Sequence, residues 1–175
     1  MKKCYLIICY LLIWFSGTVE AQKSGPNLPQ RTVQLAVVQH LDYGQILLPS
    51  GSSGGTVVID YAGARQLNNG LVAYPGDTYS QAILSFNLCP GRTINIQYAP
   101  SIQLTDNASH SMAMTIDKIR VGNTLLTASG QSFSSNKGCN DLHYMELGTT
   151  LTVKGTSFNP PGTYNGSFNI TVAYQ

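Results

Sequence analysis

Residues 83–98 read Ile-Leu-Ser-Phe-Asn-Leu-Cys-Pro-Gly-Arg-Thr-Ile-Asn-Ile-Gln-Tyr, and this stretch decides the fold class. Two short runs of strand-forming residues, at 83–88 and 94–98, flank a Cys-Pro-Gly turn. In the second run Ile94, Ile96 and Tyr98 alternate with polar residues, which is the period of a half-buried strand. The stretch therefore predicts two strands joined by a turn.

The same pattern recurs along the chain, between clusters of Gly, Pro, Asn and Ser that favour turns. Apolar residues alternate at Val33, Leu35 and Val37; within 43–48; at Val57 and Ile59; at Met112, Met114 and Ile116; at Leu151 and Val153; and at Phe168, Ile170, Val172 and Tyr174. The sequence has no long apolar stripe at helical spacing free of Gly and Pro. Many short strands with regular turns predict an all-β sandwich or barrel. We expect residues 129–141 to be a polar loop.

The composition narrows the range of functions. Charged residues make up 10% of the 175-residue chain, against about 25% in an average soluble domain, and Ser, Thr, Asn and Gln contribute 54 residues. The formal net charge of +2 is too small and too scattered for the basic surface that binds DNA or RNA. We therefore expect no nucleic-acid partner. The hydrophobic content of 43% is sufficient for a buried core.

The N-terminus has the three parts of a secretory signal peptide. Two lysines follow Met1, residues 5–15 form an apolar run, and Val19-Glu20-Ala21 supplies small residues at the cleavage positions. The run is about half the length of a membrane-spanning helix, which favours cleavage over an uncleaved transmembrane anchor. We expect a signal peptide at residues 1–21, a flexible leader at 22–30, and a single β-sandwich domain at 31–175 with no integral membrane segment in the mature chain.

Cysteine usage follows from this processing. Cys4 and Cys9 leave with the signal peptide, so Cys89 and Cys139 remain as the one possible pair in a chain bound for an oxidising compartment. We expect a disulfide between them. Closing a loop of about fifty residues would restrict the unfolded chain by about 4 kcal/mol. The alternative is a catalytic or metal-binding thiol, but no second cysteine or histidine lies at ligand spacing around Cys89.

The sequence contains no recognisable motif for catalysis or for a cofactor. It has no nucleophile elbow, no paired metal-binding histidines and no phosphate-binding loop. On a strand, Asp141 and His143 would point to one face and could begin a metal site, but we interpret them as a polar stretch that leads into a strand. The aspartates lie singly beside turns, where Asp caps its own backbone. We therefore expect no catalytic residues, no metal site and no cofactor.

The final segment, residues 162–175, is a turn followed by a strand that runs to the last residue. Its apolar residues fall on one face, with Tyr174 penultimate and Gly162 fourteenth from the end. The segment resembles the C-terminal motif of chaperone–usher pilus subunits, although any sheet that ends in a half-buried strand shows this alternation. In those subunits the last strand borders a groove, which a chaperone fills first and the N-terminal strand of the next subunit fills later. The resemblance implies an assembly strand formed by Gly162, Phe168, Ile170, Val172 and Tyr174.

The same resemblance requires a donor strand near the N-terminus. The leader is polar and broken by prolines, so Val33, Leu35 and Val37 are the candidate donor residues. The alternative is that these three residues form the first strand of the domain itself.

Further motifs extend the resemblance over residues 41–175. They are Leu41-Asp42-Tyr43-Gly44, Gly63-Ala64-Arg65, Phe86-Asn87-Leu88-Cys89-Pro90-Gly91, Ile102-Gln103-Leu104-Thr105, Leu151-Thr152-Val153 and the final Pro-Gly-Thr-Tyr strand. In this order they resemble the bacterial family catalogued as domain of unknown function 4402, which belongs with pilin-like and spore-coat-U-like secreted domains. The resemblance implies an antiparallel, immunoglobulin-like (pilin-like) β-sandwich in the cell envelope.

These observations together predict a secreted, non-enzymatic protein that is a fimbrial or surface-assembly subunit and associates through β-strand edges. We expect its partners to be other copies or related surface subunits, with a periplasmic chaperone and an outer-membrane usher during export. We expect it to pass through the periplasm to the cell surface, in a fimbrium or extracellular. The alternative is a monomeric glycan- or matrix-binding β-sandwich module, for which the tyrosines supply stacking platforms.

Overall fold

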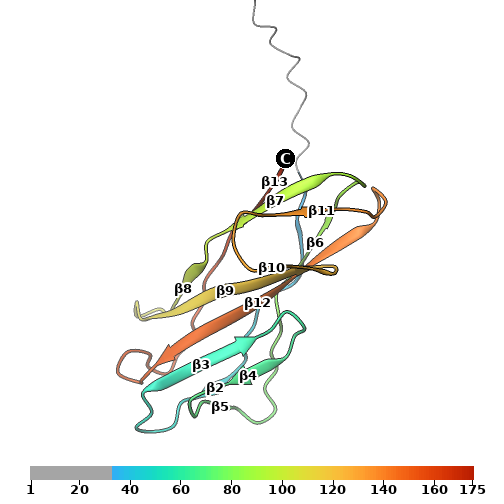
Figure 1. The fold of residues 1–175 in the computed structure, drawn as a ribbon. Helices are drawn as coiled ribbons and strands as arrows, with labels where there is room; N and C mark the ends of the chain where they lie inside the picture. The colour runs from blue at the N-terminus through green and yellow to red at the C-terminus, as the bar shows by residue number, and fades with distance from the viewer. Residues whose placement is uncertain (1–32) are drawn as a thin grey trace, which may run out of the picture. The chain divides into compact units, whose positions relative to one another are not determined.

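The computed structural model describes residues 33–175, and in this range it contains β-strands and no helix (Figure 1). Every strand pair is antiparallel. The prediction of an all-β antiparallel fold is therefore confirmed. The predicted signal peptide and leader lie outside the described residues. Residues 33–175 offer no helical segment that could cross a bilayer.

The main sheet has eight strands and is organised around β12, the longest strand (Figure 1). Strands β6 and β3 pair with successive parts of one edge of β12, and β9 pairs along its other edge. Strand β1 pairs with β6, β4 with β3, and both β8 and β10 with β9. The strand bounds are β1 Ala36–Gln39, β3 Gly54–Ile59, β4 Arg65–Leu67, β6 Ile83–Asn87, β8 Ser101–Thr105, β9 Ser111–Val121, β10 Thr124–Leu126 and β12 Leu142–Lys154.

Two smaller sheets complete the fold. The three-stranded sheet has the order β11-β7-β13, with β13 at one edge. A two-stranded sheet joins β2 to β5. Their bounds are β7 Thr93–Tyr98, β11 Gln131–Ser134, β13 Ile170–Tyr174, β2 Ile46–Leu47 and β5 Val72–Ala73.

The apolar faces of the main sheet and the three-stranded sheet meet in one core. On β7, Ile94 and Ile96 are completely buried, as the alternation in the sequence predicts. On β12, Met145 and Leu147 are completely buried in the same cluster. Burial of each such side chain contributes roughly 1.5–3 kcal/mol to folding, so this interlayer core holds the two sheets together.

The predicted polar loop at 129–141 is wrong in its first part. Residues 131–134 form β11, which pairs with β7 and places Phe133 opposite Ile94. Phe133 is the single inward-facing apolar residue in this strand, so the sequence shows no alternation there. The strand is stabilised by its pairing with β7 and by the burial of this one side chain. The second part of the segment, residues 135–141, is irregular and carries Cys139.

The predicted disulfide is present. Cys89 follows β6 and Cys139 precedes β12, and the bond joins residues separated by 50 positions. Because β6 and β12 are neighbouring strands with Leu142 opposite Asn87, the disulfide fastens the ends of two paired strands.

Candidate functional site

One incompletely covered edge of the described structure lies along β13, the C-terminal strand. Within the described residues its partner is β7, where Ile170, Val172 and Tyr174 stand opposite Tyr98, Ile96 and Ile94. Residues that stand opposite one another point to the same face of a sheet, so all three face inward. Ile170 and Val172 are nevertheless half-buried, and Tyr174 is 38% exposed. The inner face of this edge strand is therefore incompletely covered.

The backbone of β13 is also incompletely paired. Gln175 donates its N–H to the carbonyl of Thr93 on β7, at 3.1 Å. Alternate residues of an antiparallel edge strand bond to the neighbour, and those between point their N–H and C=O groups away from it. Because Gln175 bonds to β7, the residues that present free backbone groups are Ile170, Val172 and Tyr174. The side chains that lack cover and the backbone groups that lack a neighbour belong to the same three residues.

A second incompletely covered edge lies along β1. Val37 stands opposite Leu84 on β6, which stands opposite the completely buried Met145 on β12. Val37 therefore faces inward, yet 57% of it is exposed. Among the described strands β1 has β6 as its one neighbour. Within residues 33–175, both edges thus carry inward-facing apolar side chains that are incompletely covered.

A groove of about 1310 Å³ extends between these edges. Leu35 and Val37 line it on the β1 side, and Phe168 and Ile170 line it on the β13 side. Its floor is formed by apolar side chains of the main sheet, namely Leu84, Leu104, Met112, Met114, Leu151 and Val153. Among the described residues that line it, Asp42 is the one with a formally charged side chain. The groove is thus an elongated, mostly apolar channel beside strand edges that have free hydrogen-bonding groups.

The structure places the predicted assembly residues unequally. Phe168 and Ile170 line the groove, whereas Val172 and Tyr174 continue along β13 beyond it. Gly162 also lies at the groove, but a Cβ there would meet its nearest atoms at 3.8 Å, which is an ordinary contact. The glycine that the packing requires is Gly166, where a Cβ would lie 2.5 Å from Cδ2 of Leu104. The two glycines could not be ranked from the sequence alone, because the distinction depends on a contact between Gly166 and β8.

The candidate donor residues lie in the domain's own structure. Val37 pairs with the β6 strand of the same chain, and Val33 and Leu35 pack partly buried against the core. The second interpretation of this segment, as the first strand of the domain, therefore describes the structure. Val37 is therefore already paired within the same chain.

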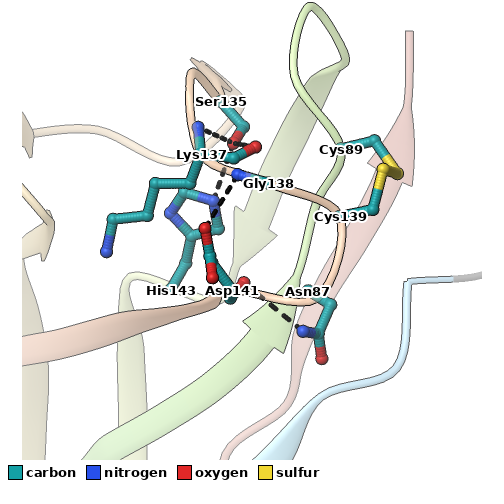
Figure 2. Close-up of a disulfide and its surroundings, with 8 residues drawn as sticks. All are labelled: Asn87, Cys89, Ser135, Lys137, Gly138, Cys139, Asp141 and His143. Atoms are coloured by element: carbon teal, nitrogen blue, oxygen red, sulfur yellow. Dashed lines mark hydrogen bonds between the residues drawn. A yellow bond between two sulfur atoms is a disulfide. The ribbon is translucent and has the colours of Figure 1, made fainter.

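Asp141 and His143 do not converge on a metal site (Figure 2). The imidazole of His143 bonds through Nε2 to the hydroxyl of Ser135 at 2.8 Å, and the Asp141 carboxylate accepts the N–H of Gly138 at 2.9 Å. No cluster of three or more His, Cys, Asp or Glu side chains suitable for a metal ion occurs within residues 33–175.

The aspartates have structural roles in turns, as expected. Asp42, Asp60 and Asp106 each accept a backbone N–H two residues further along the chain, at 2.8–2.9 Å. Asp77 forms a buried two-point ion pair with Arg65, at 2.6 and 3.0 Å, which holds the pKa of the Asp77 carboxyl below its usual value. These contacts use the carboxylates to fix loops and leave them dispersed over the molecule.

The tyrosines are equally dispersed. Tyr43 and Tyr98 are buried, while Tyr74 and Tyr144 are exposed on different parts of the fold. Tyr79 lies over the guanidinium of Arg65, whose Cζ is 4.3 Å from the ring centroid. The exposed rings do not form a shared platform in the described structure, so no observation here favours a glycan site over the groove.

The comparison with protein families gives one match. The model of a family described as a domain of unknown function (DUF4402) matches residues 33–174, nearly the whole of the described chain. The chain therefore belongs to this family. No curated protein and no solved structure matches it.

Proposed function

We propose that this member of the DUF4402 family is a surface-assembly subunit whose groove between β1 and β13 accepts a β-strand from another protein chain. The proposal rests on one observation: two incompletely covered strand edges border the same groove. Ile170 presents an incompletely buried apolar side chain and free backbone groups, and Val37 on the opposite edge faces inward with more than half of its surface exposed. A strand added in the groove would cover the apolar side chains of both edges and pair with the free backbone groups of β13.

The energetics favour such an addition. An extended segment lying along β13 gains main-chain hydrogen bonds with the free edge, while its alternate side chains enter the apolar channel. Covering the inward-facing side chains yields about 25 cal/mol for each Å² of apolar surface removed from water. The preferred occupant is therefore an extended strand with alternating apolar residues and little charge.

The source of the strand is constrained by the chain itself. Residues 22–30 contain Leu28 as their one large aliphatic side chain and include two prolines, which lack the N–H that a paired strand needs. Residues 36–39 are already paired in the domain as β1. We therefore propose that the donor strand comes from a related subunit, with a chaperone strand as its precursor during export.

The same proposal includes the finer fold type and the location. We infer an immunoglobulin-like, pilin-like sandwich that lacks one strand, related to spore-coat-U-like domains, in a protein exported with removal of residues 1–21. The disulfide supports an oxidising compartment. We propose a path through the periplasm, with a chaperone and an outer-membrane usher, to a fimbrium or another surface assembly.

A pair of proline substitutions tests this function. In Val172→Pro the lost N–H points to the free edge, where a proline is tolerated within an edge strand. In Ala173→Pro the lost N–H is one that bonds to β7, so this variant should lose stability as well. The assay is electrophoresis, without heating, of protein isolated from the native cell surface. Wild type should form a ladder of subunits, and Val172→Pro should be a folded monomer.

Two outcomes contradict the proposal. A Val172→Pro ladder equal to that of wild type would show that the free edge of β13 takes no part in assembly. Wild-type protein recovered solely as a monomer would favour the glycan- or matrix-binding alternative.

A further inference from the structure

His143 lies buried where the irregular segment at residues 135–141, called here the disulfide loop, meets the core. His143 is 3% exposed. The imidazole stacks on Phe86 of β6, with ring centroids 5.3 Å apart and an interplanar angle of 21°. It meets the ring of Phe133 on β11 edge-on, at 5.1 Å and 75°. A titratable ring thus occupies a position in an aromatic cluster.

The hydrogen bonds of this ring suit its neutral form (Figure 2). Nε2 is 2.8 Å from the Ser135 hydroxyl. That oxygen accepts the N–H of Lys137 at 3.1 Å. For the hydroxyl proton, the lone pair of Nε2 is a closer acceptor than the Lys137 carbonyl, which lies 3.5 Å from the Ser135 oxygen. A hydroxyl that donates to Nε2 leaves the proton of the neutral ring on Nδ1. The neutral imidazole therefore joins the disulfide loop to the first part of β12.

The surroundings disfavour a positive charge on the ring. Strands β6 and β11 contribute no ionisable side chain, and the charged groups nearby are Lys137 and Asp141 of the disulfide loop. Burial first, and repulsion by Lys137 second, lower the pKa of His143, while the backbone of Leu88 and the charge of Asp141 act in the opposite direction. The carboxylate of Asp141 is bonded to the N–H of Gly138 and not to the ring. The face of Phe86 attracts a cation, but it supplies no counter-charge.

We propose that His143 is an acid-sensitive latch, whose protonation at Nε2 releases the disulfide loop from the core while the Cys89–Cys139 bond keeps the loop tethered. The inference is independent of the groove and of its occupant. Release breaks the Ser135–His143 contact and the bond from the Ser135 N–H to the carbonyl of Arg92. The device thus converts acidification into opening of the disulfide loop at this end of the core.

The direction of the effect follows from linkage. The ring is neutral when the loop is closed and takes the ordinary histidine pKa of about 6.5 when the loop is open. The contribution of His143 to closure is complete above about pH 6.5 and falls as the pH drops below that value. The open population should rise by at most about tenfold for each pH unit, down to the pKa of the closed state.

Amide hydrogen exchange in the full mature chain measures this opening directly. The N–H of Ser135 bonds to the carbonyl of Arg92 at 3.1 Å, and the N–H of Lys137 bonds to the Ser135 hydroxyl, so both report on the loop. Protection factors are determined between pH 4.5 and 7.5, relative to the unfolded chain at each pH. Protection of these two amides should fall up to about tenfold per unit below about pH 6.5, while that of Val58, which pairs with Gln66 in the β3–β4 ladder, should be constant.

Two histidine variants separate the latch from general acid sensitivity. His143→Gln stays neutral throughout, so its loop protection should not change with pH. His110→Gln alters a partly exposed histidine that bonds to Asp106 in the β8–β9 turn, and it should behave as wild type. Loop protection that is independent of pH in wild type, or an equal acid response in His143→Gln, would overturn the proposal.

A measurement on the wild-type protein covers the case in which His143→Gln does not fold. The ring resonances of His143 should titrate below the ordinary histidine value. The loss of protection should begin near pH 6.5 and level off at the midpoint of that titration. A midpoint at or above the ordinary value overturns the latch.

Discussion

The two valines Val37 and Val57 offer a direct test of whether the groove is open in the isolated domain. Both belong to strands of the main sheet, but Val57 is completely buried in β3, whereas Val37 faces inward from β1 and is 57% exposed. The matched substitutions are Val37→Ala and Val57→Ala. Each substitution removes two methyl groups and lowers the intrinsic strand propensity by the same amount.

The expected magnitudes differ because of burial. At complete burial, two methyl groups contribute about 1.6 kcal/mol in transfer free energy, and the cavity they leave raises the cost of Val57→Ala to about 2–3 kcal/mol. At Val37 less than half of the side chain is buried and the site is open, so no cavity forms. Val37→Ala should therefore lower the free energy of unfolding by about 0.7 kcal/mol.

Urea denaturation of dilute, monomeric domain measures both values. With a slope of about 2 kcal/mol per M urea, the midpoint should fall by about 1 M or more for Val57→Ala and by about 0.3 M for Val37→Ala. The slope itself should be the same in both variants. Equal losses of stability would mean that Val37 is covered in the free domain, and the account of the groove as a site that lacks a strand would then be refuted.

Two further predictions concern covalent and steric constraints. Replacing Cys89 and Cys139 together by Ala should lower the free energy of unfolding by about 4 kcal/mol, because the bond closes a loop of 50 residues; a loss below about 1 kcal/mol in urea denaturation would contradict this. Gly166→Ala should cost about 1–3 kcal/mol because the new methyl overlaps β8. Gly162→Ala should change stability by no more than about 0.5 kcal/mol, and thermal unfolding that gives the reverse order would disprove the packing argument.

Local periodicity was sufficient to predict those strands that have one buried face. Ile94, Ile96 and Tyr98 alternate because β7 lies between the core and solvent, and the structure buries all three. The first part of β12 escaped prediction because inward His143 and exposed Tyr144 obscure the alternation. In such segments the pairing partner, more than the segment's own residues, determines the strand.

One of the two borders of the groove could be predicted from the sequence. The C-terminal alternation identified β13 from the sequence, and β13 borders the groove through Ile170. The opposite border could not be assigned, because the role of Val37 depends on whether its strand pairs with β6 of the same chain. The groove floor combines β6, β8, β9 and β12, and their adjacency is set by long-range pairing that leaves no local pattern.

The central position of β12 also has a consequence for the order in which the fold can form. Its three neighbours, β3, β6 and β9, all precede it in the chain. The β3–β4, β8–β9 and β9–β10 hairpins can form from local contacts, but they cannot join into one sheet until Lys154 has emerged. Pairings between distant segments are slow to form, and strand edges that wait for a partner are prone to aggregate. We therefore expect the main sheet to be completed late in folding, and the strand edges that await β12 to be most prone to aggregation before that step.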